Sequence, residues 1–559
     1  MSVATTVDPT TLAVVQGWMG QIANEMDITL VRSAFSTVIS EQCDRACGLY
    51  SAEDGGTIVQ GTTGLPMFVG SMQFAVRAVR DKVLAEGDAV PGDVYCLNDP
   101  YLAGTHLHDV KLIQPFFYDG QLRAYLAATG HWMDVGSSAP GGWNPFATDV
   151  LQEGLRIPPV KVVHAGQLDH DLLALILANL RLPRDARGDF QAKLNALRVG
   201  EQRLSELFAK YGAATVEAVI AEARTRAERH MRSYLAELPD GVYEYEDYLD
   251  DDGVTDQPLR VHLRATVAGD ALALDFSGSS PPCKGPYNSS VANTIAASYI
   301  AIKHLFPDVP LNAGSLAPLR FTVPATTFLA ASFPKAHEGY LDVGERVKDV
   351  VLGALAQACP ERAVAAPFGT LPIISLSGVD PRDSRYYVTI LIAGGGYGGS
   401  RATDGLMNGA LPIGIARAAS VEVTEQRFPL RFHRYALRPD SGGAGWRMGG
   451  CGTECEVEVL GEQTLVSDLA DRMRFAPFGV LGGQPGATTE LYLVRDGERR
   501  PLSKEVGVEL RRGDRVVMRY PGGGGYGDPA ERERELVLRD VRRGYLTPER
   551  ARAVFGVAT

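Results

Sequence analysis

Hydrophobic side chains near the start of the chain recur at the spacing of a long amphipathic helix. They are Leu12, Val15, Met19, Ile22 and Met26. Steps of three and four residues put all of them on one helical face, and the preceding pair Asp8-Pro9 is typical of a capped first turn. The pattern therefore predicts a helix that packs on the rest of the protein through one side.

The segments that follow alternate between strand and helix patterns. Residues 47–61 predict a hairpin that turns at Asp54-Gly55, and a helix is expected near 71–86. Apolar runs at 110–117 and 122–128 then predict two buried strands.

A nearly unbroken helical pattern with alternating charges on its exposed face covers residues 195–236. Beyond it, apolar and polar residues alternate at period two, which favours antiparallel strands. From about 427 onward, glycine turns and short strands dominate, and a closing helix is expected around 530–554. These changes predict an α+β, multi-domain protein. The predicted regions are 1–235, 236–426 and 427–559.

Length, charge and cysteine usage narrow the class of protein. A chain of 559 residues is too long for one hydrophobic core. Its net charge of -12 offers no basic patch, which argues against nucleic acid as a partner. The sequence contains no signal peptide pattern and no run that approaches the roughly 18 apolar residues of a membrane span. Seven cysteines, an odd number, fit free thiols, so a cytoplasmic location without membrane attachment is expected.

Two polar patterns favour structural roles over metal binding. The pairs Cys43/Cys47 and Cys451/Cys455 are separated by three residues rather than the two of a typical zinc pair. The acidic stretch 247–253 lacks the spaced ligands of an EF-hand loop, so a solvated turn between strands is expected.

Two glycine runs, at 393–405 and 521–529, invite comparison with phosphate-binding loops. Neither carries the lysine and hydroxyl residue of a P-loop, nor a GxGxxG between a strand and a helix. Tight turns and close backbone packing are therefore expected, and no nucleotide site is predicted on this chain.

Histidines and aspartates gather in two segments beside predicted buried strands. GTHLHDV contributes His106, His108 and Asp109, and GHWMDVG contributes His131 and Asp134. Imidazole nitrogen and carboxylate oxygen are ligands that divalent first-row metals prefer. Core histidines paired with nearby aspartates are the alternative, but three histidines in so short a stretch favour a metal site.

Spacing alone does not select the ligands. His106 and His108 would share a face of a strand, whereas His106 and Asp109 would face together if the segment turned or looped. Asp44, from the SEQCDRACG segment at the first hairpin, is a further candidate.

Longer motifs resemble the hydantoinase B and 5-oxoprolinase family. In order they are NDPYLAGTHLHDVKLIQPFF, GHWMDVGSSAPGG, LQEGLRIPPVKV, NLRLPRDARGDFQAKLNA, LPDGVYEYEDYLDDDG, LDFSGSS, LRPDSGGAGWRMGG and PGGGGYGDP. The resemblance covers nearly the whole chain, and so many motifs in one order make it specific.

The resemblance implies a B-type subunit of an ATP-dependent cyclic amide hydrolase that opens hydantoin, oxoproline or lactam rings. It implies a hetero-oligomer in which an A-type partner subunit binds ATP and magnesium. It also implies one divalent transition metal, either zinc, manganese, iron or cobalt, in this chain. The metal ligands of the family fall on Asp44, His106, Asp109 and His131.

Departures from the family pattern bear on the pocket around these ligands. The family usually has proline at the position of His108, so His108 is not expected to be an obligatory ligand. Together with Asp134 it is a candidate to orient ligands or move a proton. Trp132 and Ser137-Ser138 also differ from many relatives, which predicts an altered pocket wall.

Two other functions stay open. Acetone and acetophenone carboxylases share the scaffold and the ligands, and there ATP would activate bicarbonate and a ketone enol. A non-catalytic scaffold that completes the partner's site is the second alternative, although the presence of all four ligands argues against it. The THL segment and the LQEGLRIPP run are closer to the hydantoinase branch, which favours amide hydrolysis.

Overall fold

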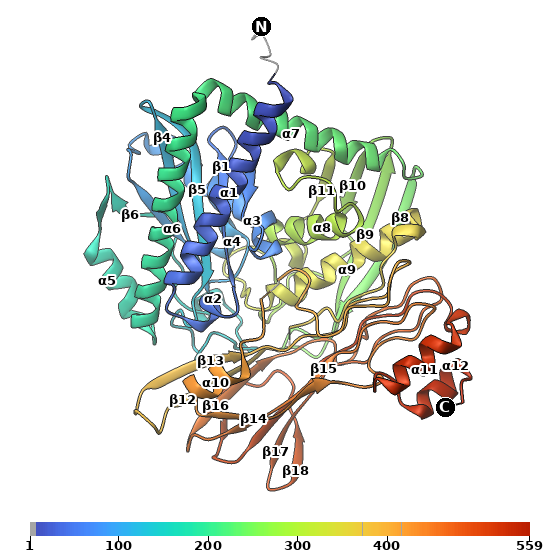
Figure 1. The fold of residues 1–559 in the computed structure, drawn as a ribbon. Helices are drawn as coiled ribbons and strands as arrows, with labels where there is room; N and C mark the ends of the chain where they lie inside the picture. Colours follow the sequence, from blue (N-terminus) through green and yellow to red (C-terminus); the bar gives the residue numbers. More distant parts are fainter. Residues whose placement is uncertain (1–6, 372, 415, 559) are drawn as a thin grey trace.

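The computed structural model describes residues 7–371, 373–414 and 416–558. Within these ranges helices and sheets mix along the whole chain, which confirms the α+β class (Figure 1). The helices are α1 Pro9–Ser33, α2 Thr37–Ser40, α3 Pro66–Glu86, α4 Pro100–Ala103, α5 His170–Ala178, α6 Pro183–Tyr211, α7 Ala213–Leu235, α8 Val291–Leu305, α9 Tyr340–Ala358, α10 Val421–Arg427, α11 Arg534–Arg542 and α12 Pro548–Phe555.

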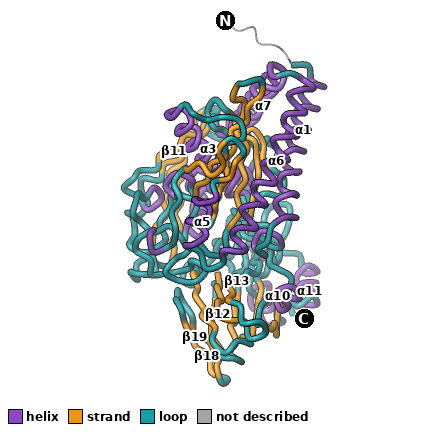
Figure 2. Tube along the Cα trace, turned by 90° about the vertical axis from the view of Figure 1, so that its left-hand side faces the viewer, coloured by secondary structure: helices purple, strands orange, loops and turns teal. Residues whose placement is uncertain are grey.

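The first sheet carries the two histidine segments. Its strands run in the order β2-β1-β5-β4-β3-β6-β7. α1 and α6 pack on each other and cover one face, while α3 packs on the other face, so β4 and β5 are almost wholly buried (Figures 1 and 2). The strands are β1 Arg45–Ser51, β2 Thr57–Gln60, β3 Val94–Leu97, β4 Asp109–Tyr118, β5 Gln121–His131, β6 Val160–His164 and β7 Gln167–Leu168.

A second sheet, β11-β10-β9-β8, lies beside α8 and α9. α8 packs on α3 and on α9, so these helices connect the first sheet to the second. α9 in turn packs on β8 and β9, with nearly every side chain buried. The strands are β8 Gly241–Leu249, β9 Leu259–Ala268, β10 Ala271–Asp275 and β11 Leu319–Thr322.

Two further sheets form the lower part of the molecule in Figure 1, with α11 and α12 at their side. Their orders are β13-β12-β16-β19 and β14-β15-β20-β17-β18. The strands are β12 Ile373–Val379, β13 Tyr386–Leu391, β14 Leu430–Leu437, β15 Thr453–Val459, β16 Thr464–Leu469, β17 Glu490–Arg495, β18 Glu498–Pro501, β19 Val508–Leu510 and β20 Arg515–Arg519.

The glycine runs pack backbone against backbone within this lower part. A Cβ on Gly396 would lie 1.9 Å from the carbonyl oxygen of Gly450, and one on Gly523 would lie 2.0 Å from that of Tyr397. The backbone N–H of Gly450 donates to Tyr397 and that of Gly523 donates to Gly450. The runs are therefore packing segments, as the sequence predicts.

Most predicted elements form, with differences at their ends. α1 buries the predicted face, and β1 and β2 form the predicted hairpin. The helical pattern over 195–236 is two helices, because Gly212 has a φ of +77° and separates α6 from α7. The closing segment is likewise two short helices, α11 and α12. The predicted region boundaries at 235 and 426 stay a prediction.

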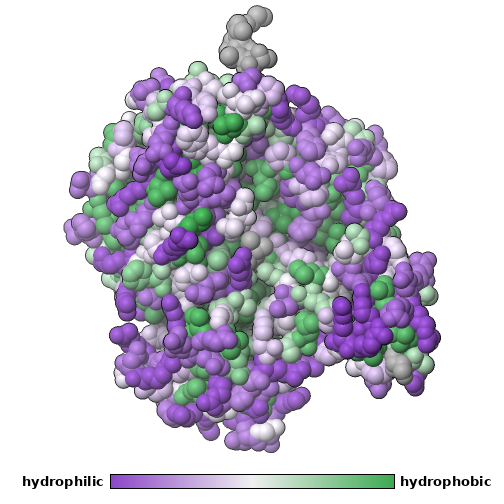
Figure 3. Space-filling view, viewed as in Figure 1, coloured by the Kyte–Doolittle hydropathy of each residue, from purple (hydrophilic) through white to green (hydrophobic). Residues whose placement is uncertain are grey.

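On the face shown in Figure 3, hydrophilic side chains dominate and the hydrophobic ones are scattered. None of the helices in the described ranges combines the length and apolar character needed to cross a bilayer.

Candidate metal centre

Strand pairing brings two of the predicted ligands together. Asp109 is the first residue of β4 and His131 is the last of β5, and the antiparallel register places them directly opposite each other. His106 lies in the short loop between α4 and β4. The segment is therefore a loop at His106, which is the arrangement that makes His106 and Asp109 face together.

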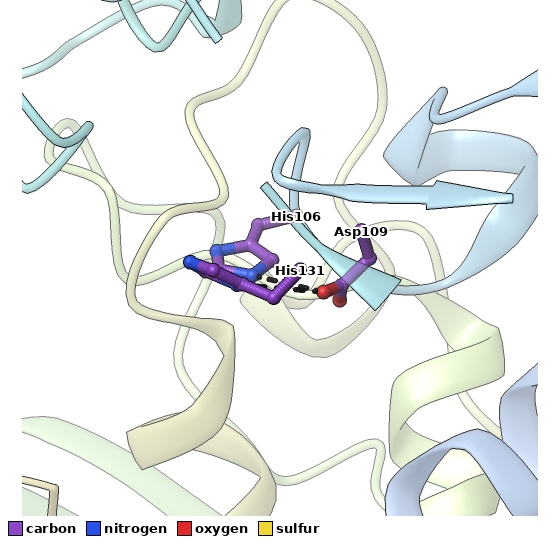
Figure 4. Close-up of side chains that lie close together, drawn as sticks. All are labelled: His106, Asp109 and His131. Carbon is purple, nitrogen blue, oxygen red and sulfur yellow. Dashed lines mark ion pairs between the residues drawn. The ribbon is translucent and has the colours of Figure 1, made fainter. Parts of the chain in front are cut away.

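The three side chains form a compact buried cluster (Figure 4). His106 Nε2 is 3.4 Å and His131 Nδ1 is 3.6 Å from Asp109 Oδ1. One ligand atom from each residue lies within 4.8 Å of the others. At most 2% of each residue is exposed, so these polar groups sit away from bulk water.

Asp44 lies beside this cluster. It borders the same cavity as His106 and His131, and its backbone carbonyl accepts from the His131 N–H at 3.1 Å. Asp44 Oδ1, Asp109 Oδ1 and His131 Nε2 are buried with no hydrogen-bond partner among the described residues. Buried polar atoms are normally paired, so this group of nitrogen and carboxylate oxygen atoms fits a bound divalent cation.

Glu338 and Tyr340 complete the surroundings of the cluster. Glu338 Oε1 is 2.8 Å from His106 Nδ1, and the Tyr340 hydroxyl donates to Asp109 Oδ2 at 3.3 Å. A carboxylate on the far nitrogen of a histidine holds the orientation of the ring, so His106 Nε2 faces Asp109 and can bind a cation once it has lost its proton. Neither residue is predicted from the sequence, because both lie more than 200 positions beyond His106 and follow no repeated spacing.

Glu153 anchors the segment that carries Glu338. Its carboxylate accepts from the backbone N–H groups of His337 and Glu338 at 2.7 to 2.9 Å. Burial, followed by repulsion from Glu338, holds the pKa of Glu153 well above its usual value. Glu153 belongs to the LQEGLRIPP run, so that motif has a structural link to the cluster.

His108 lies beside the cluster, but its hydrogen-bond partner differs from that of His106. Its Nδ1 lies 2.6 Å from the Trp132 carbonyl oxygen, while its Nε2 has no hydrogen-bond partner in the described residues and lies 3.8 Å from Glu338 Oε1. The rings of His108, His131 and Trp143 stack nearly parallel. A Cβ on Gly142 would lie 2.0 Å from His108 Nε2, so glycine is required there.

Asp134 is occupied by a different network. Its carboxylate accepts from the backbone N–H groups of Gly136 and Arg181 at 2.9 and 3.0 Å, and from the Arg181 guanidinium at 2.9 Å. Gly141 also donates to it at 3.3 Å. These contacts fix the loop after His131, and none of them joins Asp134 to the clustered side chains.

Two buried lysines hold the backbone beneath the cluster. Lys111 donates to the Asp109 carbonyl and to the Thr105 hydroxyl, and Lys193 on α6 donates to the carbonyls of Val110 and Gly130. Burial lowers the pKa of each lysine to about 8. They brace the ends of β4 and β5 where the ligand candidates emerge.

The histidines of the cluster differ in proton affinity. Burial alone would lower the pKa of His106, but Asp109 and Glu338 outweigh it and raise the pKa to about 10. Burial lowers the pKa of His131 to about 4, and His108 and His106 add to this effect. Burial also lowers the pKa of His108.

The pKa values of the two carboxyl groups are also shifted in opposite directions. Burial and the nearby Asp109 raise the pKa of Asp44 to about 8. Burial would also raise the pKa of Asp109, but His106 and His131 hold it well below its usual value. Strongly perturbed groups gathered beside one cavity are typical of functional sites.

Comparison with known proteins identifies the family to which the chain belongs. The chain matches the family model described as hydantoinase B/oxoprolinase over residues 8–529, and it belongs to this family. It is 35% identical to caprolactamase subunit beta of Pseudomonas jessenii, over 99% of this chain and 96% of that protein. It is 33% identical to 5-oxoprolinase 1 of Arabidopsis thaliana over 90% of this chain, and spans 41% of that longer protein.

Two solved structures share the fold. The crystal structure of the ATP-dependent caprolactamase from Pseudomonas jessenii matches with a TM-score of 0.91 and 32% identity, covering 99% of this chain and 97% of that chain. A nucleotide-free structure of acetone carboxylase matches with a TM-score of 0.88 over 99% of this chain and 80% of that chain. The second structure is only 18% identical in sequence, so this match is evidence for a shared fold and not for a shared function.

Proposed function

We propose that this chain is the metal-binding B-type subunit of an ATP-dependent cyclic amide hydrolase. The observation that carries the proposal is the buried cluster of His106, Asp109 and His131, with Asp44 beside it and with unpaired ligand atoms. Its family membership and its likeness to a caprolactamase subunit support the reaction class. Zinc, manganese, iron and cobalt all suit this set of nitrogen and oxygen ligands.

The proposed division of labour follows from the chemistry of amides. A ring amide is a poor electrophile because resonance stabilises it and its nitrogen leaves badly. An A-type partner would use ATP to phosphorylate the carbonyl oxygen and so make the ring carbon reactive. This chain has no recognisable phosphate-binding loop, and its glycine runs are occupied by backbone packing.

The residues of this chain would prepare the hydrolytic step. A divalent metal held here would lower the pKa of a bound water beside the activated ring carbon. Glu338 would keep His106 in the tautomer that binds through Nε2, and Tyr340 would orient Asp109 by its hydrogen bond. His108 Nε2, buried and without a hydrogen-bond partner among the described atoms, is a candidate to orient a ligand or to take up a proton during this step.

Loss of Asp109 tests the order of these steps. Asp109→Ala would be assembled with its A-type partner and assayed for phosphate release and for ring-opened product from hydantoin, 5-oxoproline and simple lactams. We expect ring opening to stop while slow ATP cleavage persists, because activation is uncoupled from hydrolysis.

Parallel assays with added bicarbonate separate the other functions. Product that forms only with bicarbonate and contains its carbon would identify the ketone carboxylase reaction instead. Ring opening by Asp109→Ala at the wild-type rate would contradict a metal mechanism and favour the scaffold alternative.

A further inference from the structure

A hollow in the surface presents apolar side chains to solvent where α3, α4 and the start of α8 lie side by side (Figure 1). Its volume is about 480 Å³, which is room for one or more side chains of another molecule. Of the residues that border it, Leu102 is 42% exposed, Val291 41% and Phe333 51%. Apolar side chains scattered singly over a surface are ordinary, but three around one hollow are typical of a surface that binds a partner.

One arginine borders this hollow with its hydrogen-bonding capacity unused. Arg156 makes no hydrogen bond within the described part of the chain. Its guanidinium carbon lies 4.5 Å from the centre of the Phe333 ring, and its nearest carboxylate, Asp99 Oδ2, is 3.7 Å away. Asp99 is buried, and its other oxygen accepts from the Tyr101 N–H. An arginine stacked on an aromatic ring presents its planar donors in a fixed orientation, which suits a carboxylate that arrives from outside.

The composition of the hollow defines what can bind there. Among the described residues that border it, Asp99 and Arg156 are the only charged ones, and the others are aromatic, aliphatic or small. Arginine and aromatic side chains are enriched at protein interfaces, whereas lysine and glutamate are depleted. The complementary group is an apolar side chain with a carboxylate beside it, because the apolar part fills the hollow and the carboxylate pairs with Arg156.

The floor of the hollow leads to the histidine cluster. The Tyr101 hydroxyl donates to the Lys335 carbonyl at 2.6 Å, and the Tyr101 ring lies edge-on to His337 with the ring centres 4.8 Å apart. Glu338 follows directly in the chain and is 2.8 Å from His106 Nδ1. A molecule bound in the hollow therefore rests on the segment that orients His106.

We propose that the A-type subunit docks at this hollow through an apolar side chain and a neighbouring carboxylate that pairs with Arg156. This inference rests on the proposed function, in which that subunit must bring an activated carbonyl to the histidine cluster. Docking beside the segment that carries Glu338 places the partner close to the cluster. The hollow contributes binding and no chemical step, so its loss should weaken the complex and leave the metal content unchanged.

Binding of the purified A-type partner to variants of this chain tests the proposal. Arg156→Glu should raise the Kd of the complex at least about 30-fold, because repulsion replaces attraction at a central contact. Arg156→Lys should raise it less, since an ammonium keeps the charge but loses the paired donors. Arg499→Glu is the matched control, because Arg499 also stacks on a ring, 4.9 Å from the centre of Tyr492, but lies in the exposed strand β18.

The outcomes separate this inference from the proposed function. A wild-type Kd for Arg156→Glu would overturn the docking site and leave the proposed function intact. A wild-type chain that binds no A-type partner would count against both. Ring opening by Arg156→Glu should reach the wild-type rate at saturating partner, and a lower rate together with a wild-type Kd would contradict a role in docking alone.

Leu102→Ser tests the apolar part of the contact without changing a charge. We expect the Kd to rise about 10-fold, because a buried leucine anchor is lost from the interface. Leu465→Ser is the control, since Leu465 is 36% exposed but lies in β16 of the third sheet. Equal values of Kd in the two variants would contradict the assignment of the hollow.

Hexanoate carries the same combination of an apolar chain and a carboxylate in a small molecule. It should compete with the A-type partner only at about millimolar concentration, because it makes few contacts. Submillimolar binding of hexanoate to the isolated chain, measured by calorimetry, together with an unchanged Kd of the Arg156→Glu complex, would assign the hollow to a small ligand and overturn the docking inference.

Discussion

Two side chains of the cluster are each held through one atom by a neighbouring residue, so that a second atom faces the other members of the cluster. Glu338 holds His106 through Nδ1, and Tyr340 holds Asp109 through Oδ2. His131 is fixed by its place opposite Asp109 at the end of β5. A metal site needs this kind of support, because ligands that rotate freely lose affinity to entropy and to competing hydrogen bonds.

Metal analysis of single variants tests the ligand set. The wild-type chain should hold about one transition-metal ion, and His106→Ala and His131→Ala should lose most of it, because each removes one of about four protein ligands. His108→Ala should retain the metal and serves as the buried histidine control. Equal metal content in all four proteins, measured by elemental analysis, would contradict the assignment.

The proton affinities of the cluster predict how metal binding depends on pH. Near pH 7 the metal-free protein carries a proton on Asp44, with a pKa of about 8, and on His106, with a pKa of about 10. Both groups must lose their protons to bind a cation, so binding should release about two protons and tighten as pH rises. The affinity should stop increasing above about pH 10.

Calorimetric titrations of the metal-free chain in buffers of different ionisation enthalpy measure this release. Asp44→Asn should release about one proton fewer than the wild type. Binding that is independent of pH between 6 and 8 would contradict the proton positions described above.

At the scale of elements, the sequence predicted which segments form helices and strands better than it predicted where each element ends. The face of α1 and the hairpin of β1 and β2 follow from local spacing alone, and they form as expected. The break between α6 and α7 depends on the φ of +77° at Gly212, which the surrounding helical pattern obscured. Glu338 could not be found at all, because only tertiary packing brings the segment before α9 to His106.

Substitution of two helical glycines by alanine should change the stability of the protein in opposite directions. Gly70 in α3 faces α8, where a Cβ would lie 2.5 Å from the Ala296 Cα, whereas Gly17 in α1 is exposed with nothing within 4 Å. Gly70→Ala should therefore lower stability by about 1–3 kcal/mol, because the backbone of α8 must shift. Gly17→Ala should raise it by about 1 kcal/mol through helix propensity.

Thermal unfolding of the two variants beside the wild type decides between packing and propensity. A midpoint that rises in both variants would show that α3 and α8 are not in close contact at Gly70. A midpoint that falls in both would show that the exposed face of α1 is covered in the protein as it exists in solution.

At the scale of the whole molecule, a buried ionic network joins the regions around the cavity. Arg346 on α9 pairs with Asp471 at 2.5 Å, and Arg472 pairs with Asp349 at 2.5 Å and with Asp247 of β8 at 2.8 Å. α9 begins at Tyr340, the residue that contacts Asp109. The network therefore connects the metal candidate, the second sheet and the segment that follows β16.

Removal of one cation from this network should destabilise the protein strongly. Arg472 is fully buried, so Arg472→Met removes one of the cations that pair with the buried carboxylates of Asp349 and Asp247, and a loss of about 3–5 kcal/mol is expected. Arg512→Met is the matched control, because the Arg512–Glu462 pair is exposed and surface pairs contribute little. Denaturant unfolding of both variants, with metal content measured in parallel, tests the connection. Equal stabilities would contradict the role of the network, and a destabilised Arg472→Met that keeps its metal would show that the first sheet holds the ligands without support from α9.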